Sequence, residues 1–261
     1  MPSGAEKMWH DAHDVVRGQG VELYALATAS EIGPYFDEMR RVGFIVHHLP
    51  HCSRRLLDLR YCLSLYRFLR RNRINAVQIH PEAWRFTNFV VSRIAGVRRV
   101  VTTVHNVFRH KGLARLRRLV TMRLLKWLGG EVVAIGDSVL ANERTYGYEP
   151  RLIYNWVDVS QFRRLYDEVW RKRKRQVLSI PSDAKLISLV GNCSTIKNHR
   201  FFLRMFARLP TGFHALHMGK EDERHLHERK LAVELGVERR VHFLGVRSDV
   251  RDLLELCDVY V

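Results

Sequence analysis

The chain has 261 residues, of which 46% are hydrophobic and 27% are charged. This length allows one or two domains with cores of their own, which excludes a disulfide-stapled miniprotein, and the composition excludes a chain that is disordered throughout. The formal net charge of +17 favours anionic partners, with nucleic acid, anionic lipid and a phosphorylated substrate as the candidates.

The cysteines and the hydropathy pattern indicate a cytoplasmic protein. Cys52, Cys62, Cys193 and Cys257 lack the paired close spacing of zinc and redox motifs, so a reducing compartment fits best. The longest stretch without Asp, Glu, Lys or Arg has 12 residues, 42–53, and is shorter than the roughly 18 to 20 that cross a bilayer. The N-terminus also lacks the pattern of a signal peptide. We therefore expect no spanning helix.

Short β-rich runs alternate with stretches of helical period, which is typical of parallel α/β layers with crossover helices. In the first half, a spacing of three and four residues predicts a helix whose buried face carries Leu56, Leu59, Leu63, Tyr66 and Leu69. These elements predict an N-terminal, acceptor-side Rossmann-like domain over residues 1–154. Its expected strands are 21–27, 44–49, 75–80, 98–104, 131–135 and 151–154.

A polar, strongly basic stretch interrupts the alternation at residues 155–182, and we interpret it as an interdomain linker. The alternation resumes in residues 183–261, which predicts part of a second Rossmann-like domain. Three basic clusters have helical character, and for each a solvated helix face and a surface that binds a membrane or polyanion remain alternatives. The clusters are Arg54–Arg73, Arg109–Lys126 and Arg163–Arg175. The expected strands of the second domain are 185–190, 213–218, 240–245 and 258–261.

The turn after strand 185–190 is the first candidate for chemistry. It runs from Gly191 through Asn192 to Lys197 and Asn198. A glycine that leaves a strand lets backbone N–H groups approach a ligand, and a lysine at the start of a helix adds a charge to the helix dipole. The turn is not a Walker P-loop, because no second glycine precedes the lysine. A phosphate cradle and an ordinary turn between a strand and a helix both fit.

His105 follows the strand at 98–104, at the edge where an open α/β sheet collects ligands. A catalytic role and a purely structural role both remain open for it, whereas His80, which precedes Pro81, is interpreted as structural. We expect no metal site. The group His47, His48, His51 and Cys52 could suggest one, but adjacent strand residues such as His47 and His48 point to opposite faces.

Taken together, the residues resemble the retaining nucleotide-sugar glycosyltransferases of family 4, which have the GT-B fold. The resemblance rests on five segments in the family's order. They are SGAEKMWHDAHDVVRGQGVEL at 3–23, VTTVHNV at 101–107, VVAIGDSVLANE at 132–143, RLIYNWVDVSQF at 151–162, and the pair LVGNCSTIKNHRFFL and VHFLGVRSDVRDLLELCDVYV that begins at 189 and 241.

The resemblance implies roles for the candidate residues. Lys197 and the Gly191 turn would neutralise the diphosphate of a nucleotide sugar, and His105 would hydrogen-bond the sugar that is transferred. By the same resemblance, Lys197 and His105 are the catalytic positions and Ser3 and Gly4 line the acceptor or phosphate side. The donor-binding positions would be Gly191, Asn192, Lys197, Gly219 and Gly245.

The sequence departs from the family pattern in four places. Asn192 stands where many relatives carry Arg, and Trp156 stands where the family often has Gly. The family's two glutamates eight positions apart would come after Val261. No strand precedes the Gly-rich loop, so we expect a first domain without its initial strand, a second domain that is incomplete at its C-terminus, and a gap between strands 21–27 and 75–80.

The expected function is transfer of a sugar, with retention of configuration, from a nucleoside-diphosphate donor to a polysaccharide, lipid-linked or other cell-envelope acceptor. The donor is a substrate, and no cofactor is expected. The basic first domain predicts peripheral attachment to the anionic inner face of the membrane. The alternative is a non-catalytic fragment that binds a polyanion, either nucleic acid or an anionic membrane. Nucleic acid is not the expected partner, because the aromatic residues fit core stripes and not a stacking surface.

Overall fold

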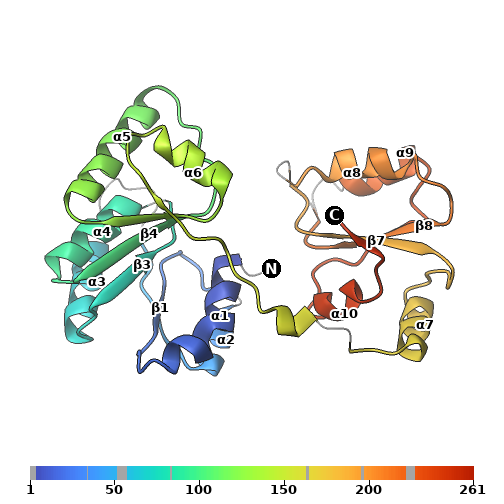
Figure 1. The fold of residues 1–261 in the computed structure, drawn as a ribbon, viewed down its shortest axis with the longest axis horizontal. Helices are drawn as coiled ribbons and strands as arrows, with labels where there is room; N and C mark the ends of the chain where they lie inside the picture. The colour runs from blue at the N-terminus through green and yellow to red at the C-terminus, as the bar shows by residue number, and fades with distance from the viewer. Residues whose placement is uncertain are drawn as a thin grey trace. The chain divides into compact units, whose positions relative to one another are not determined.

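The computed structural model describes residues 4–33, 35–51, 58–82, 84–162, 165–194, 197–221 and 227–261. The chain divides into two compact units, residues 2–157 and residues 158–261, and each is an α/β unit with parallel strands (Figure 1). Among the described residues, no helix combines the length and the apolar character that crossing a bilayer requires.

The first unit alternates strands and helices as the sequence predicts, and each observed strand lies inside its expected range. A sheet of order β3-β4-β5-β6 holds the core, and β1 and β2 form a separate parallel pair. The elements are α1 (Gly4–Arg17), β1 (Tyr24–Ala27), α2 (Tyr35–Val42), β2 (Ile45–His48), α3 (Leu59–Arg71), β3 (Ala76–Ile79), α4 (Arg85–Ile94), β4 (Arg99–Val104), α5 (Gly112–Trp127), β5 (Glu131–Ala134), α6 (Asp137–Arg144) and β6 (Arg151–Leu152).

Strands β1 and β3 belong to different sheets, which matches the expected gap between residues 21–27 and 75–80. In the described part of the chain, β1 pairs only with β2, in the register Tyr24 to Ile45, and β3 pairs only with β4. Strands β1 and β3 therefore form no ladder with each other.

The buried face of α3 differs from the predicted one. Leu59 and Leu63 are 71% and 46% exposed, whereas Tyr61, Leu65 and Leu69 are buried. The Tyr61 hydroxyl donates a 2.8 Å hydrogen bond to Asn88 Oδ1 on α4, which turns the Tyr61 face of α3 toward α4. Both series of residues have helical spacing, so the sequence pattern alone could not choose between them. Leu56 lies outside the described residues.

The second unit is a three-layer sandwich with the sheet order β10-β7-β8-β9. Leu186 and Ile187 are successive residues of β7 and point to opposite faces: Ile187 packs with α8 and α9, and Leu186 packs with α10 and α7 (Figure 1). The elements are η1 (Val159–Phe162), α7 (Glu168–Val177), β7 (Lys185–Val190), α8 (His199–Phe206), β8 (Phe213–Met218), α9 (His227–Glu234), β9 (Val241–Phe243), α10 (Val250–Leu254) and β10 (Val259–Tyr260).

Residues 158–182 belong to the second compact unit. The sequence predicts a linker over residues 155–182, so most of that segment is part of a folded unit. Asp167 caps α7 by accepting a 2.8 Å hydrogen bond from the Trp170 N–H. The charged side chain of Arg175 turns inward and donates to the carbonyl oxygens of Ser182, Ala184 and Leu256 at 2.9 to 3.0 Å. The basic composition that suggested a linker therefore includes a buried arginine that holds α7 to the sheet.

Candidate active site

Three loops of the second unit are tied together at the carboxyl ends of β7, β8 and β9. The Gly191 N–H donates to the Met218 carbonyl at 2.9 Å, and the Gly219 N–H donates to the Gly245 carbonyl at 2.8 Å. The Cys193 N–H adds a third bond, to the Lys220 carbonyl at 2.8 Å. Parallel α/β sheets bind ligands at this edge, and the structure brings Gly191, Gly219 and Gly245 together there.

Two of these glycines are required by the backbone. A Cβ at Gly219 would lie 2.0 Å from the Gly191 carbonyl oxygen, so no side chain fits there without moving the loop. Gly245 has a φ of +67°, a conformation that favours glycine. The surface that these loops form therefore consists largely of backbone, as a site that approaches a phosphate closely requires.

Lys197 lies over the first of these loops. Its Cε and Cδ come within 3.4 and 3.5 Å of the position that a Cβ on Gly191 would take, and the residue is exposed. No ion pair joins its ammonium to a carboxylate within the described ranges. Asn198 follows in the left-handed conformation, and α8 begins at His199 without a side-chain cap. A cation without a carboxylate partner and an uncapped helix N-terminus suit an anionic group.

Asn192 takes part in the loop packing. Its Oδ1 accepts a 2.9 Å hydrogen bond from the Lys220 N–H, so this side chain ties the loop after β7 to the loop after β8. This contact could not be predicted from the sequence, because it joins residues of two loops that are 28 positions apart. Ser3 lies outside the described residues, and Gly4 is the first residue of α1 in the first unit.

In the first unit, His105 is the last member of a chain of three aromatic side chains. The Trp9 Nε1–H on α1 donates to His80 Nε2 at 3.1 Å, and His80 Nδ1 lies 2.8 Å from His105 Nε2. Both histidines follow the carboxyl ends of neighbouring strands, β3 and β4. The sequence places His80 at the same sheet edge as His105 and favours a structural role for it, and the structure adds the direct contact between the two rings.

This series of hydrogen-bonded side chains determines which ring nitrogen of each imidazole carries the proton. Because Trp9 can only donate, His80 Nε2 must accept, and the proton of neutral His80 lies on Nδ1 and points to His105 Nε2. Neutral His105 therefore carries its own proton on Nδ1. Burial lowers the pKa of His80 to about 4, and burial together with the nearby Arg85 charge lowers the pKa of His105. His105 thus offers an N–H donor at neutral pH.

The depressed pKa of His80 makes the first unit sensitive to acid. Below pH 6.5 the unfolded chain binds a proton that folded His80 accepts only near pH 4, so the free energy of unfolding falls as the pH falls through this window. The free energy of unfolding of the wild type should therefore fall between pH 7 and pH 5 by about 2 kcal/mol more than that of His80→Asn. One titrating group can change this free energy by up to about 1.4 kcal/mol per pH unit.

Urea unfolding at the two pH values measures this difference. Tryptophan fluorescence reports mainly on the first unit, which holds Trp9, Trp84, Trp127 and Trp156, whereas Trp170 alone lies in the second. An equal loss of stability in the wild type and in His80→Asn would show that His80 does not titrate as this environment requires.

A buried ion network holds the helices around His105. Arg118 on α5 donates to both carboxylate oxygens of Glu143 on α6 at 2.7 and 2.8 Å, and it also pairs with Glu82. Glu82 pairs in turn with Arg85 at the start of α4, and the Tyr148 hydroxyl donates to Glu143. Burial beside the Glu143 carboxylate raises the pKa of Tyr148. The two ion pairs of Arg118 join residues 36 and 25 positions apart in the sequence, and no motif predicted them.

Trp156 adapts to its place without backbone strain. It is not among the residues with positive φ in the described chain. Its Nε1–H donates to the Met8 carbonyl at 3.2 Å, and its ring meets Trp9 edge to face with centroids 6.0 Å apart. The bulky residue that departs from the family pattern therefore packs against α1, next to the chain that ends at His105.

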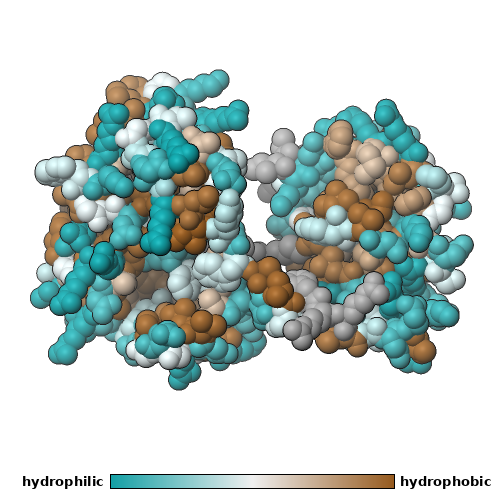
Figure 2. All heavy atoms as spheres, viewed as in Figure 1, coloured by the Kyte–Doolittle hydropathy of each residue, from teal (hydrophilic) through white to brown (hydrophobic). Residues whose placement is uncertain are grey.

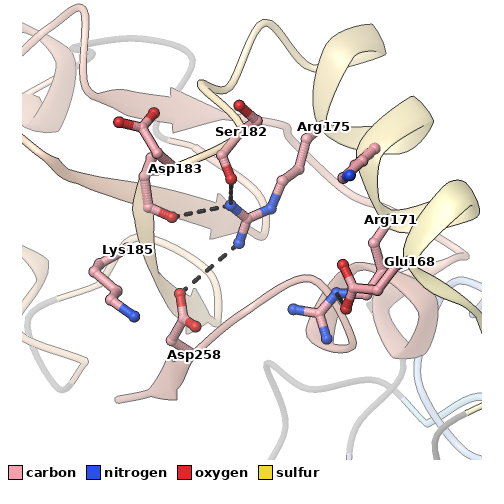
Figure 3. A pocket seen from close by; sticks show the side chains of 9 residues that line it. Glu168, Arg171, Arg175, Ser182, Asp183, Lys185 and Asp258 are labelled. Atoms are coloured by element: carbon pink, nitrogen blue, oxygen red, sulfur yellow. Dashed lines mark hydrogen bonds and ion pairs between the residues drawn. The ribbon is translucent and has the colours of Figure 1, made fainter.

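A cavity of about 310 Å³ in the second unit lies at the other end of the strands (Figure 3). Lys185 at the start of β7 and Asp258 just before β10 line it, together with Arg175. Because the Arg175 guanidinium is used by three carbonyl oxygens and by Asp258 at 3.8 Å, this arginine supports the fold. The cavity is thus separate from the loops after β7, β8 and β9.

With this geometry in view, comparison with known proteins decides the family. The model of Glycosyltransferase Family 4 matches residues 2–161, and that of Glycosyl transferases group 1 matches residues 184–261. This chain belongs to glycosyltransferase family 4. The family and the GT-B fold expected from the sequence are therefore confirmed.

Two curated relatives of this family 4 chain have names that refer to cell-envelope glycans. The lipopolysaccharide core biosynthesis glycosyltransferase LpsE of Rhizobium meliloti (strain 1021) is 38% identical over 88 residues, which are 33% of this chain and 25% of the relative. An Escherichia coli UDP-Gal:alpha-D-GlcNAc-diphosphoundecaprenol alpha-1,3-galactosyltransferase is 22% identical over 253 residues, or 88% of this chain. The matched region is 63% of that enzyme's length, so the chain spans less than two thirds of either relative.

A solved structure shares the fold over the whole chain. The crystal structure of Anabaena Alr3699/HepE in complex with UDP and glucose has a TM-score of 0.79 at 18% identity, and the match covers 100% of this chain and 70% of that one. At this identity the likeness shows the fold of the family 4 chain.

Proposed function

We propose that this protein transfers a sugar from a nucleoside-diphosphate sugar to a lipid-linked or polysaccharide acceptor of the cell envelope, with retention of configuration. The observation that carries the proposal is the surface formed by the loops after β7, β8 and β9, over which Lys197 lies without a carboxylate partner in the described chain. Support for the donor comes from HepE, which was solved with UDP and glucose. Support for the acceptor comes from the names of the two relatives.

The proposed chemistry gives each candidate residue a physical task. As the bond between the sugar and the diphosphate breaks, negative charge grows on the diphosphate, so the Lys197 ammonium interacts more strongly with the transition state than with the bound donor. The Gly191 and Gly219 backbone and the start of α8 add fixed dipoles. His105 donates its Nδ1–H to a hydroxyl of the transferred sugar. The donor is consumed as a substrate, and no further cofactor enters the proposal.

A transfer assay tests the function. The protein is incubated with labelled nucleotide sugars, UDP-galactose and UDP-glucose first, and with a bacterial lipid-linked glycan fraction. We expect label in the glycan fraction and release of one nucleoside diphosphate per sugar transferred. The proposal fails if the folded protein transfers no sugar from any nucleotide sugar of the panel to this fraction or to extracted polysaccharide.

We also propose that α5 attaches the protein to the anionic inner face of the membrane. Five large apolar residues of this helix are exposed at helical spacing, with Leu113 at 85% and Trp127 at 81%, and four exposed basic residues stand between them in the sequence. In Figure 2 brown apolar and teal charged residues alternate over this part of the first unit. The apolar residues are Leu113, Leu116, Val120, Leu124 and Trp127, and the basic ones are Arg115, Arg117, Arg123 and Lys126.

The mixture of exposed apolar and basic residues is what an interfacial helix requires. Apolar side chains enter the acyl boundary, and each Lys or Arg near an anionic leaflet contributes about 1 kcal/mol. The opposite face of α5 stays bound to the core, because Met122 and Leu125 are buried and Arg118 joins the ion network. The helix can therefore contact a membrane without leaving the domain.

Vesicle flotation measures this attachment. We expect the wild type to float with vesicles that contain phosphatidylglycerol and not with pure phosphatidylcholine, and the double variant Leu113→Glu, Trp127→Glu to bind about tenfold more weakly. The control is Val177→Glu on α7, where the native residue is 74% exposed, and it should float like the wild type. Equal binding to both vesicle types, or by the double variant and the wild type, would refute the role of α5.

A further inference from the structure

Three potential metal ligands meet beneath the Gly191 loop. Cys193 lies in the loop, His199 is the first residue of α8, and His217 lies in β8. One ligand atom from each lies within 4.8 Å of the other two. The Cys193 Sγ is 3.8 Å from His217 Nε2, and the two imidazole rings meet at 81° with centroids 4.9 Å apart. The three side chains therefore surround one point from three separate elements.

The two histidines are buried with unused ring nitrogens. His199 and His217 are 3% and 2% exposed. Within the described ranges, neither ring nitrogen of His199 and not Nδ1 of His217 has a hydrogen-bond partner, and all three atoms are shielded from water. Buried polar atoms are rarely left without a partner. A bound ion would take up a lone pair of one of the two unpartnered His199 nitrogens.

We propose that Cys193, His199 and His217 bind one zinc ion. A thiolate and two imidazoles are a ligand set that zinc prefers, with bonds of about 2.3 Å to sulfur and about 2.0 Å to nitrogen. A tetrahedral ion with these bonds separates sulfur from nitrogen by about 3.6 Å, close to the 3.8 Å between Cys193 and His217. Ligand atoms that lie as far apart as 4.8 Å have to approach each other by roughly 1.2 to 1.5 Å to reach tetrahedral zinc distances. A water molecule completes the fourth position.

Zinc binding changes two bonds at this place. The Cys193 thiol, which forms no disulfide, loses its proton to solvent as the zinc–sulfur bond forms. His217 Nε2 now lies 3.0 Å from the Gly191 carbonyl oxygen, and it gives up this hydrogen bond to bind the ion, with its proton moving to Nδ1. The ion then joins the loop, α8 and β8 directly.

Cobalt(II) is the probe, because it replaces zinc in such sites and is coloured. We expect the metal-free wild type to bind one equivalent of Co²⁺ with a thiolate-to-cobalt charge-transfer band in the near ultraviolet and strong visible bands of tetrahedral coordination. Zinc should remove both sets of bands by displacement. A wild-type titration without the thiolate band overturns the proposal, and this outcome needs no variant to fold.

Matched variants assign the ligands. Cys193→Ser should lose the charge-transfer band, and His199→Gln should weaken cobalt binding at least tenfold. Cys257→Ser and His214→Gln change a cysteine and a buried histidine of the same unit outside the cluster, and both should keep the wild-type spectrum. Zinc should raise the melting temperature of the wild type and of these two controls but not of Cys193→Ser. A band that persists in Cys193→Ser contradicts the assignment.

Discussion

Lys197→Ala should lower the rate of sugar transfer a hundredfold or more while the melting temperature stays within about 1 °C of the wild type. Loss of one fixed group that stabilises developing charge costs roughly a hundred- to a thousandfold in turnover. The fold should survive, because Lys197 is exposed and its hydrogen bond to Ser194 in the Gly191 loop is made by its backbone N–H, which alanine keeps. Lys197→Arg should recover part of the rate, since the charge remains but the shape differs.

The matched control for this variant is Lys185→Ala. Lys185 begins β7, the strand that leads to the Gly191 loop, so it lies at the opposite edge of the same sheet. It is also an exposed cation, and its removal changes the net charge equally. Initial rates at saturating donor should be near wild type for Lys185→Ala. Wild-type turnover in Lys197→Ala, or equal losses in both variants, would remove the assigned role.

Glu143→Gln should cost about 3–5 kcal/mol of stability, because it leaves a buried arginine without its main counter-charge. Glu143 is 0% exposed and accepts two hydrogen bonds from Arg118 and another from Tyr148. The amide keeps the shape and one acceptor, so the loss reports on the charge. Urea unfolding followed by tryptophan fluorescence gives the free energy of the first unit.

A nearby exposed glutamate provides the comparison. Glu149 pairs with Arg144 at 2.6 Å, but their side chains are 63% and 54% exposed, so Glu149→Gln should cost less than about 1 kcal/mol. Adding Arg118→Met to Glu143→Gln should restore part of the stability, since the unpaired charge is then gone. Equal effects of the two glutamate variants would show that the buried network does not stabilise the unit.

Local sequence patterns predicted most of the fold. The runs 185–190 and 213–218 are strands over the predicted residues, because β-branched and apolar residues bounded by turn residues define a buried parallel strand. The prediction of the buried face of α3 was wrong for a physical reason. The pair Leu59 and Leu63 and the pair Tyr61 and Leu65 both follow helical spacing, and the contact of Tyr61 with Asn88 decides between the two faces. Only tertiary structure contains that contact.

The candidate site was predictable where a single turn defines it. The Gly191 loop and Lys197 stand in one stretch of sequence, and the position of His105 after a strand placed it at the ligand edge. The hydrogen-bonded series from Trp9 through His80 to His105 could not be predicted, because its first bond alone joins residues 71 positions apart. The cluster of Cys193, His199 and His217 has no motif spacing, because its ligands come from a loop, a helix and a strand.

We propose that the loops after β7, β8 and β9, together with Lys197, hold the diphosphate of the donor. Titration calorimetry of UDP and UMP into the wild type, Lys197→Ala and Lys185→Ala tests it most directly, since the two nucleotides differ only by the second phosphate. We predict that the wild type and Lys185→Ala bind UDP at least tenfold more tightly than UMP, and that Lys197→Ala loses this preference. Equal affinities for UDP and UMP in the wild type, or an unchanged preference in Lys197→Ala, would contradict the claim.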